Sequence, residues 1–219
     1  MAGVEELTPV AQDYVKVIWS AVEWGEPPIT TKALAARFAT TQANVSETMR
    51  RLQALGLVDY RPYKPVTLTE RGRRLGVAMV RRHRLIEAFL AEVLGYAWDE
   101  VHDEAERLEH AVSDLLLERI DRLLGHPSTD PHGDPIPGPD GSWTPPPGAL
   151  LLADARPGSY RVLRVADSAP QRLVRLRKAG LVPGALLELL PGPPPTIRVG
   201  GADRRLGAED LAALRVVPA

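Results

Sequence analysis

The chain has 219 residues, of which 44% are hydrophobic and 25% charged, enough for one large globular domain or two to three small ones. It has no cysteine, which excludes disulfides and zinc–thiolate sites, so any metal site must consist of oxygen and imidazole ligands. No apolar run approaches a membrane span of roughly 18 residues, and the start MAGVEELTPV lacks the features of an export signal, so we expect a cytoplasmic protein without membrane contact.

The formal net charge of −1 hides an uneven distribution. Residues 1–84 have 13 Lys and Arg against 8 Asp and Glu, residues 85–125 have 3 against 11, and residues 126–219 have 11 against 9. A basic first part is typical of a polyanion-binding protein, and an acidic middle part is suited to a cation.

The first 70 residues predict three helices followed by two short extended segments. Thr8 and Pro9 open a helix that ends near Gly25, the second helix covers 32–38 after a cap at Thr30 or Thr31, and the third covers 42–55 after Thr41. The extended segments are LVDYR and VTLT, joined by PYKP. This order is typical of a winged helix-turn-helix that binds double-stranded DNA.

The third helix is the predicted recognition helix, because such helices place their first turns in the major groove. The residues expected to face bases are Thr41, Gln42, Ala43, Asn44, Ser46 and Glu47. The residues expected to flank them at phosphates are Arg37, Arg50, Arg51, Arg61 and Lys64. The alternative is a three-helix bundle that uses this fold for protein contacts.

The middle of the chain predicts a long helix over 70–94, an acidic segment over 99–112 and a helix from 114 to about 124 capped by Ser113. Their apolar residues outnumber what a small bundle needs, which favours a two-fold homodimer; alternatively, the surplus covers the other domains. Residues 126–148 are rich in Pro, Gly and Asp and predict a linker or an ordered loop. Short β-like runs with one helix, PQRLVRLRKAG, then predict a small β-barrel of about 70 residues.

The string HDEAERLEH places two imidazoles and four carboxylates within nine residues. Glu106, Glu109 and His110 have the spacing i, i+3 and i+4, so on a helix they share one face, and His102 lies one turn earlier. Such a set suits a divalent cation, although a solvated helix face has the same composition.

Three further residues are candidate metal ligands. His83 and Glu87 are spaced i, i+4 on the long helix, where a lone His is more often a packed core residue than a ligand. Asp13 lies between apolar positions of the first helix, so it is expected to point partly inward and to need a partner. The alternative for Asp13 is an exposed carboxylate paired with Lys16.

Taken together, these segments resemble the DtxR/MntR family of metal-dependent transcriptional repressors over nearly the whole chain. The resemblance rests on TPVAQDYVKVIW, NVSETMRRLQALGLV, RRHRLIEAFL, VHDEAERLEHAVSD and DPHGDPIPG, and LRKAGLVPGALLELL resembles the SH3-like FeoA-type domain of long members. It implies a mainly α fold with a small β part. The expected domains are a winged helix-turn-helix (1–75), a helical metal-binding and dimerisation domain (76–126), a linker (127–148) and an SH3-like domain (149–219).

The resemblance also implies the metal ligands. The primary site falls on Asp13, Glu106, Glu109 and His110, and the ancillary site on His83, Glu87 and His102. Manganese-type members have carboxylates at the first two positions, where iron-type members have Met and Cys, so Mn²⁺ is expected, with Fe²⁺ as the alternative.

Two features depart from the family pattern. Lys16 stands where manganese-type members usually have a further ligand Glu, which argues against a closely paired two-metal site. In long members the tail domain lends polar side chains to the second site, and here Asp167 or Gln171 is the candidate.

The expected function is therefore a metal-dependent repressor that binds palindromic operators of metal-transport genes as a homodimer. An Fe²⁺-responsive regulator of the same family is one alternative. A metal-dependent hydrolase is another, although the chain has no H-E-x-x-H, Gly-rich phosphate loop or G-x-S-x-G. A protein-interaction scaffold with purely structural histidines is the third.

Overall fold

A computed structural model describes residues 4–167 and 169–219, and the chain forms two compact units. Unit 1 comprises the described residues up to His83, together with Glu109–Val112 and Pro137–Trp143. Unit 2 comprises Arg84–Leu108, Ser113–Ile136 and the described residues from Thr144 to Ala219. The long helix α4 contributes its first half to unit 1 and its second half to unit 2.

Unit 1 has the predicted order of helices and strands. Its elements are η1 (Val4–Glu6), α1 (Pro9–Ser20), α2 (Thr31–Arg37), α3 (Gln42–Ala54), β1 (Val58–Asp59), β2 (Thr67–Leu68) and the start of α4 (Glu70–Glu92). The hydroxyls of Thr8, Thr30 and Thr41 accept hydrogen bonds from the backbone three residues later, which confirms these caps. Helix α1 ends at Ser20, earlier than the predicted end near Gly25.

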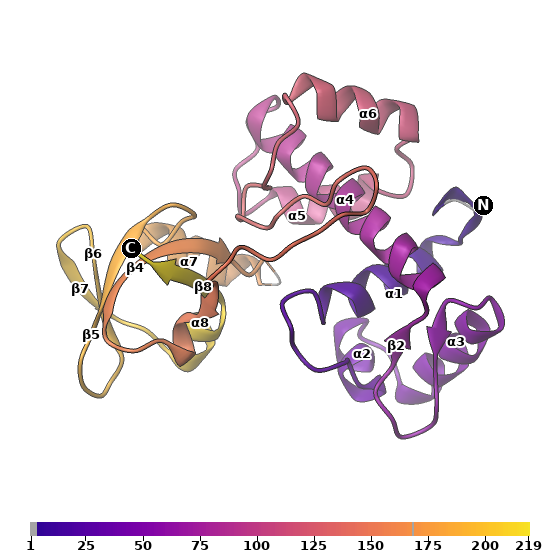
Figure 1. Ribbon diagram of the computed structural model, residues 1–219, viewed down its shortest axis with the longest axis horizontal. Coiled ribbons are helices and arrows are strands. Elements are labelled where there is room, and N and C mark those ends of the chain that lie inside the picture. The colour runs from indigo at the N-terminus through magenta and orange to yellow at the C-terminus, as the bar shows by residue number, and fades with distance from the viewer. Residues whose placement is uncertain (1–3, 168) are drawn as a thin grey trace. The chain divides into compact units, whose positions relative to one another are not determined.

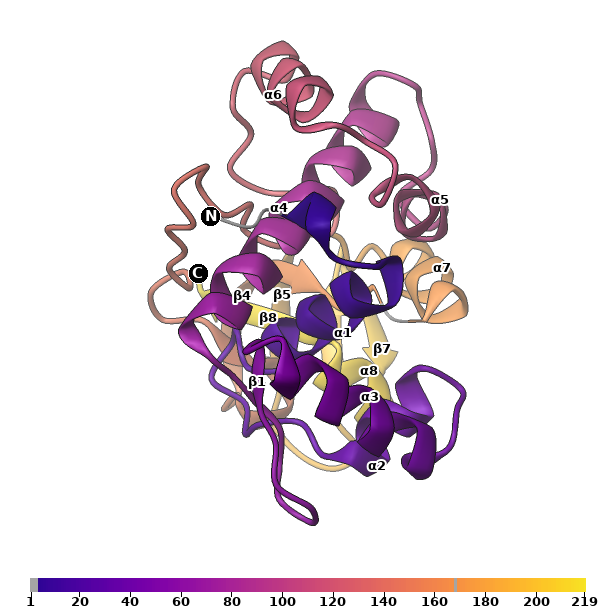
Figure 2. The same cartoon turned by 90° about the vertical axis from the view of Figure 1, so that its right-hand side faces the viewer.

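Helices α1, α2, α3 and the start of α4 lie together with the β1–β2 wing at their edge (Figure 1, Figure 2). Apolar residues from all of these elements form the core of unit 1. Val15, Leu34, Val45 and Met49 are fully buried there, and Met79 joins them from α4. Burying each such side chain contributes about 1.5–3 kcal/mol, so helix α1, which carries Asp13, and α3, the predicted recognition helix, belong to one packed body.

Unit 2 contains the remaining helices and a six-stranded antiparallel sheet. Its elements are the rest of α4, α5 (Val101–Leu108), α6 (Asp114–Leu123), β3 (Leu150–Leu151), η2 (Leu152–Asp154), β4 (Gly158–Val165), α7 (Pro170–Lys178), β5 (Leu186–Leu190), β6 (Thr196–Val199), β7 (Ala202–Arg205), α8 (Ala208–Ala212) and β8 (Leu214–Pro218). The strand order is β3-β8-β4-β5-β6-β7, with α7 and α8 beside the sheet (Figure 1).

The sheet is not a closed barrel, so the prediction of a β-barrel is wrong in this respect. The edge strands β3 and β7 do not pair with each other in the described chain. Strand β3 has only two residues, which present too few backbone groups for closure, and β7 is exposed along its length.

The Pro- and Gly-rich segment after α6 is an ordered loop rather than a flexible linker. Thr129 and Pro135 form a β-bridge, and the Val165 amide donates to the carbonyl of His132 at 2.9 Å. Further along, the ring of Trp143 stacks edge-on against Trp19 and Trp24, with centroids 5.6 and 5.8 Å away. Two successive parts of this loop therefore pack into unit 2 and unit 1, respectively.

Candidate functional site

The first cluster consists of Asp13, Glu109 and His110, all in unit 1. One ligand atom from each lies within 4.8 Å of the others. His110 Nε2 is 3.1 Å from Asp13 Oδ1 and 3.8 Å from Glu109 Oε1. Glu109 is fully buried, whereas the other two side chains are partly accessible. Two carboxylates and an imidazole therefore converge on one accessible point.

Glu109 and His110 lie in a turn and not on a helix, so the expectation that they share one helix face with Glu106 was wrong. Helix α5 ends at Leu108, and the next residues form a turn before Ser113 caps α6. The buried guanidinium of Arg82 donates to the carbonyls of Glu109 (3.4 Å) and Val112, which fixes the turn. The ligands are positioned by this turn.

Glu109 already has two close nitrogen partners. Lys16 Nζ lies 2.5 Å from its Oε1, and His83 Nδ1 lies 2.6 Å from its Oε2. Lys16 is 6% exposed, so an ammonium is buried beside the first cluster. The structure pairs Lys16 with Glu109, whereas the sequence alternative paired it with Asp13. A protonated lysine has no lone pair and cannot bind a cation.

Glu106, the remaining predicted primary ligand, belongs to unit 2. Its carboxylate lies 3.7 Å from Nε2 of His102, one turn earlier on α5. Glu106 thus stands close to the second group of ligands, described next.

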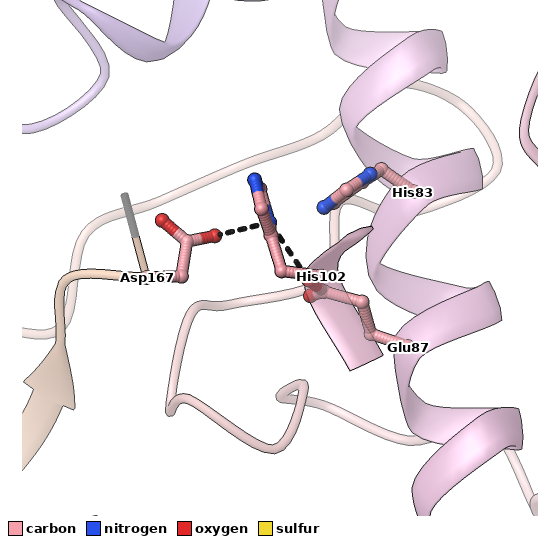
Figure 3. A group of neighbouring side chains, drawn as sticks. All are labelled: His83, Glu87, His102 and Asp167. Atoms are coloured by element: carbon pink, nitrogen blue, oxygen red, sulfur yellow. Dashed lines mark hydrogen bonds and ion pairs between the residues drawn. The ribbon is translucent and has the colours of Figure 1, made fainter. Parts of the chain in front are cut away.

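The second cluster is centred on Glu87, in unit 2. His102 Nδ1 lies 3.2 Å from Glu87 Oε1 and 3.1 Å from Asp167 Oδ2. Figure 3 draws both contacts as dashed lines. His83 is one turn before Glu87 on α4 (Figure 3), and its ring is bonded to Glu109 as described above. Of the two tail residues considered from the sequence, Asp167 lies in this cluster, whereas Gln171 is exposed at the start of α7.

Two further residues complete the second cluster and were not predicted: Asp130 and His132, whose ligand atoms lie within 4.8 Å of each other and of Glu87. His132 is fully buried; its Nε2 donates to the carbonyl of Trp98 at 2.7 Å, and its Nδ1 faces Glu87 Oε2 at 3.6 Å, longer than a hydrogen bond. The sequence signal was DPHGDP, where two acids and a His interrupt a Pro/Gly-rich run.

The loop that carries Asp130 and His132 is fixed by buried ion pairs. Asp134 accepts from Arg84 on α4 at 3.2 Å and from Arg164 on β4 at 2.6 Å, and the Asp130 carboxylate accepts from the backbone amides of residues 132 and 134. Strand β4 has a register shift between Val162 and Arg164, and such a bulge re-aims the side chains beside it.

The charges of the second cluster perturb its pKa values strongly. Burial alone lowers the pKa of His102, but the hydrogen bonds to Asp167 and Glu87 raise it to about 10. Burial also lowers the pKa of His132, but the interaction with Glu87 outweighs this effect and raises that pKa to about 10. Burial, reinforced by Asp134 and Glu87, raises the pKa of Asp130. Protons on these groups balance the buried negative charge that a cation would otherwise balance.

The predicted DNA-reading residues lie together on unit 1. All are exposed except Ser46, which is half-buried. The Asn44 side-chain amide donates to the Thr40 hydroxyl at 3.1 Å, and Arg51 pairs with Glu47 at 3.2 Å on the outer face of α3. Arg61 and Lys64 line a surface hollow between the end of α3 and the wing. Unit 1 thus presents an exposed helix N-terminus flanked by cationic side chains.

Comparison with known families covers nearly all of the described chain. Residues 6–66 match the iron-dependent repressor N-terminal DNA-binding domain, residues 69–138 its metal-binding and dimerisation domain, and residues 150–218 the FeoA domain. The chain therefore belongs to the DtxR/MntR family of metal-dependent transcriptional repressors, as its motifs indicated.

Relatives of both metal classes are similar to it. A solved manganese-dependent transcriptional repressor in complex with manganese is 46% identical with a TM-score of 0.90, covering 95% of this chain and 100% of that one. The manganese regulator SloR is 32% identical with a TM-score of 0.82, covering 97% and 100%. The iron-dependent repressor IdeR of Mycobacterium tuberculosis (strain ATCC 25618 / H37Rv) is 34% identical over 212 residues, or 90% of this chain and 92% of that protein.

None of the helices in the described part of the chain has the length and apolar character needed to cross a membrane.

Proposed function

We propose that this chain is a repressor whose affinity for palindromic operator DNA depends on Mn²⁺, with Fe²⁺ as a second activating ion. The first cluster carries the proposal, because it joins Asp13 on α1, which packs in one core with the recognition helix α3, to the turn at Glu109 and His110. A regulator that binds genomic DNA and senses free cations would work in the cytoplasm.

The donor atoms of both clusters fit a hard divalent cation. All of them are carboxylate oxygens or imidazole nitrogens, the ligands that Mn²⁺ accepts, and there is no sulfur donor to favour softer ions. Asp13, Glu109 and His110 would form the first site, and Glu106 is the fourth ligand that the resemblance to the family implies. Glu87, His102 and Asp167 would form the second, with His83 one turn earlier on α4, and Asp130 and His132 lie beside the same Glu87. Manganese-dependent and iron-dependent relatives both match this chain, and the oxygen-rich donor set favours manganese.

A cation bound in the first cluster would supply the positive charge that holds two carboxylates and an imidazole together. Without that charge Asp13 and Glu109 repel one another, and the ammonium of Lys16, which is bound to Glu109, opposes that repulsion. Fixing Asp13 fixes α1, and with it the core that supports α3. By linkage, DNA must tighten cation binding by the factor by which the cation tightens DNA binding, typically about 1–3 kcal/mol.

The homodimer is supported by an exposed apolar surface on unit 2. The residues concerned lie on α6 and at the ends of α4 and α5: Val93, Leu94, Tyr96, Leu108, Leu115, Leu116 and Leu123. Monomers rarely expose so many large apolar side chains on short neighbouring segments. A second copy of the chain would cover them and would place two recognition helices about 34 Å apart, one turn of DNA.

The experiment that tests the proposal is a DNA-binding titration with and without Mn²⁺. Asp13→Ala should abolish the Mn²⁺ stimulation while leaving a folded protein. Asp103→Ala, which removes an exposed carboxylate on α5 outside both clusters, is the matched control and should behave as the wild type. Wild-type Mn²⁺ dependence in the Asp13 variant would refute the role of the first cluster.

The alternative of a metal-dependent hydrolase is tested by assaying the Mn²⁺-loaded protein with phosphate and carboxylic ester substrates. The relatives named above are regulators, and the second cluster is enclosed by its own ion pairs, with Glu87 and His132 fully buried. We expect no turnover above that of free Mn²⁺.

A further inference from the structure

Gln12 contacts both a ligand of the first cluster and the N-terminal segment. It lies on α1 next to Asp13, is 5% exposed and belongs to unit 1, as do all its partners. Its Oε1 lies 2.7 Å from Nδ1 of His110, and its Nε2 donates to the carbonyls of Val4 (2.9 Å) and Leu7 (3.1 Å). This buried polar side chain thus has a hydrogen-bond partner for its oxygen and two for its NH₂ group.

The partners of Gln12 determine which way its amide faces. Two backbone carbonyls surround one terminal atom, and carbonyl oxygens only accept, so that atom must be the NH₂ group. A flipped amide would place its oxygen against two other oxygens. The atom facing His110 is therefore the carbonyl oxygen, and the ring nitrogen opposite it must carry the hydrogen.

The tautomer of His110 follows from this orientation. With a hydrogen on Nδ1, Nε2 is the ring nitrogen left to bind a cation, and it faces Asp13 Oδ1 at 3.1 Å and Glu109 Oε1 at 3.8 Å. A lone pair beside two carboxylates is repelled unless a positive charge lies between them. This is the arrangement that a cation requires, and the opposite tautomer would block it with a hydrogen.

We propose that Gln12 is the positioning residue of the first cluster: it holds His110 in the cation-binding tautomer and ties that ring to the N-terminal segment. The inference rests on the proposed function, because it assigns His110 Nε2 to the cation. The same amide secures the 3₁₀ turn Val4–Glu6, whose flanking residues Val4 and Leu7 pack in the core of unit 1. Order at the cluster and order at the N-terminus are thus coupled through one side chain.

Two substitutions separate the roles of Gln12. Gln12→Leu keeps the size but removes every hydrogen bond. Gln12→Glu keeps an oxygen for the Nδ1–H of His110 but loses the amide NH₂ for the two carbonyls. Gln53→Leu, at an exposed position of α3, is the matched control. Mn²⁺ affinity is measured by calorimetry on the full chain, and the order of the N-terminal segment by hydrogen exchange at the Leu7 amide, which donates to the Val4 carbonyl.

Removing the partner that orients a metal-binding histidine typically weakens affinity by about 10–100-fold. We expect that loss at the first cluster for Gln12→Leu, and affinity within about threefold of the wild type for Gln12→Glu and Gln53→Leu. Exchange at Leu7 should accelerate in both Gln12 variants. Unchanged affinity in Gln12→Leu, or equal losses in Leu and Glu variants, would overturn the proposal, because the second result is what a packing role predicts.

A direct observation needs no substitution at Gln12. Nitrogen-15 spectra of the metal-free chain, with the signal assigned through His110→Gln, should show a proton on Nδ1 of that ring; a ring without the Nδ1 proton would refute the inference even if the variants failed to fold. Failure of the proposed function can be told apart from failure of this inference. If the proposed function is wrong, Asp13→Ala will bind Mn²⁺ as the wild type does, whichever nitrogen of His110 carries the hydrogen.

Discussion

Gly133 is where an added methyl group should separate the ligand loop of the second cluster from the sheet. Its φ is +85°, and a Cβ there would lie 1.9 Å from the carbonyl oxygen of Leu163 on β4. Ordinary contact begins at 3.4 Å, so Gly133→Ala must push the loop and the strand apart by about 1.5 Å. The contacts at risk are the Val165–His132 hydrogen bond and the Arg164–Asp134 ion pair.

The cost can be worked from these contacts. The left-handed backbone costs alanine about 1–2 kcal/mol. A lost backbone hydrogen bond adds about 1 kcal/mol, and weakening a buried ion pair whose full disruption costs about 3–5 kcal/mol adds more. We expect Gly133→Ala to lower the free energy of unfolding by about 3–5 kcal/mol. Gly125→Ala is the control, because its φ is +69° and nothing lies within 4 Å of its Cβ, so it should cost only about 1–2 kcal/mol.

Urea denaturation followed by circular dichroism measures the two free energies. Hydrogen exchange at the Val165 amide reports the loop–strand contact directly. Mn²⁺ titration should show that the second cluster loses affinity in the Gly133 variant while the first cluster does not. Equal stability of the Gly133 and Gly125 variants, with unchanged exchange at Val165, would show that the loop is not held against β4 as described.

Three other predictions concern the cation, the DNA and the dimer. Because the pKa of His102 is about 10 in the metal-free chain, its ring is protonated at neutral pH and must lose that proton to bind Mn²⁺. Mn²⁺ affinity at the second cluster should therefore rise by about tenfold per pH unit for each proton displaced between pH 6 and 8, measured by calorimetry, and a flat profile would contradict this. Arg51→Ala should weaken binding to all DNA sequences about equally and flatten the salt dependence, whereas Asn44→Ala should relax sequence preference, which fluorescence anisotropy with operator and scrambled duplexes distinguishes. Leu116→Glu should give a monomer by light scattering if the exposed apolar surface is the dimer interface, with Leu186→Glu, at an exposed apolar position on β5, as the control that leaves the mass unchanged.

The helices, their caps and the family were predictable from the sequence because these signals are local. Thr8, Thr41 and Ser113 cap helices where the sequence placed them, since a hydroxyl three residues before a free amide needs no distant partner. The openness of the sheet was not predictable in the same way, because closure depends on how many backbone groups the edge strands β3 and β7 offer one another.

The ligand sets were predicted less completely, for a physical reason. Helical spacing grouped Glu109 and His110 with Glu106, but the buried Arg82 binds the carbonyls of Glu109 and Val112 and turns the chain there. His132 was missed because its role depends on a hydrogen bond to the Trp98 carbonyl, 34 residues away. Spacing reveals neighbours within one element, whereas these contacts join elements that are distant in sequence.

The buried charges of this chain are best understood as a cost that serves cation sensing. Glu87, Glu109 and His132 are fully buried, and well-packed apolar residues in such places often make a protein more stable by about 1–4 kcal/mol. The metal-free chain instead keeps them, with Lys16 beside Glu109 and protons on the second cluster beside Glu87. The ammonium of Lys16 and these protons carry less positive charge than a divalent ion. A bound cation would therefore balance the buried carboxylates better than they do. At the first cluster, we expect the free energy released by cation binding to fix α1 and, through the shared core, helix α3.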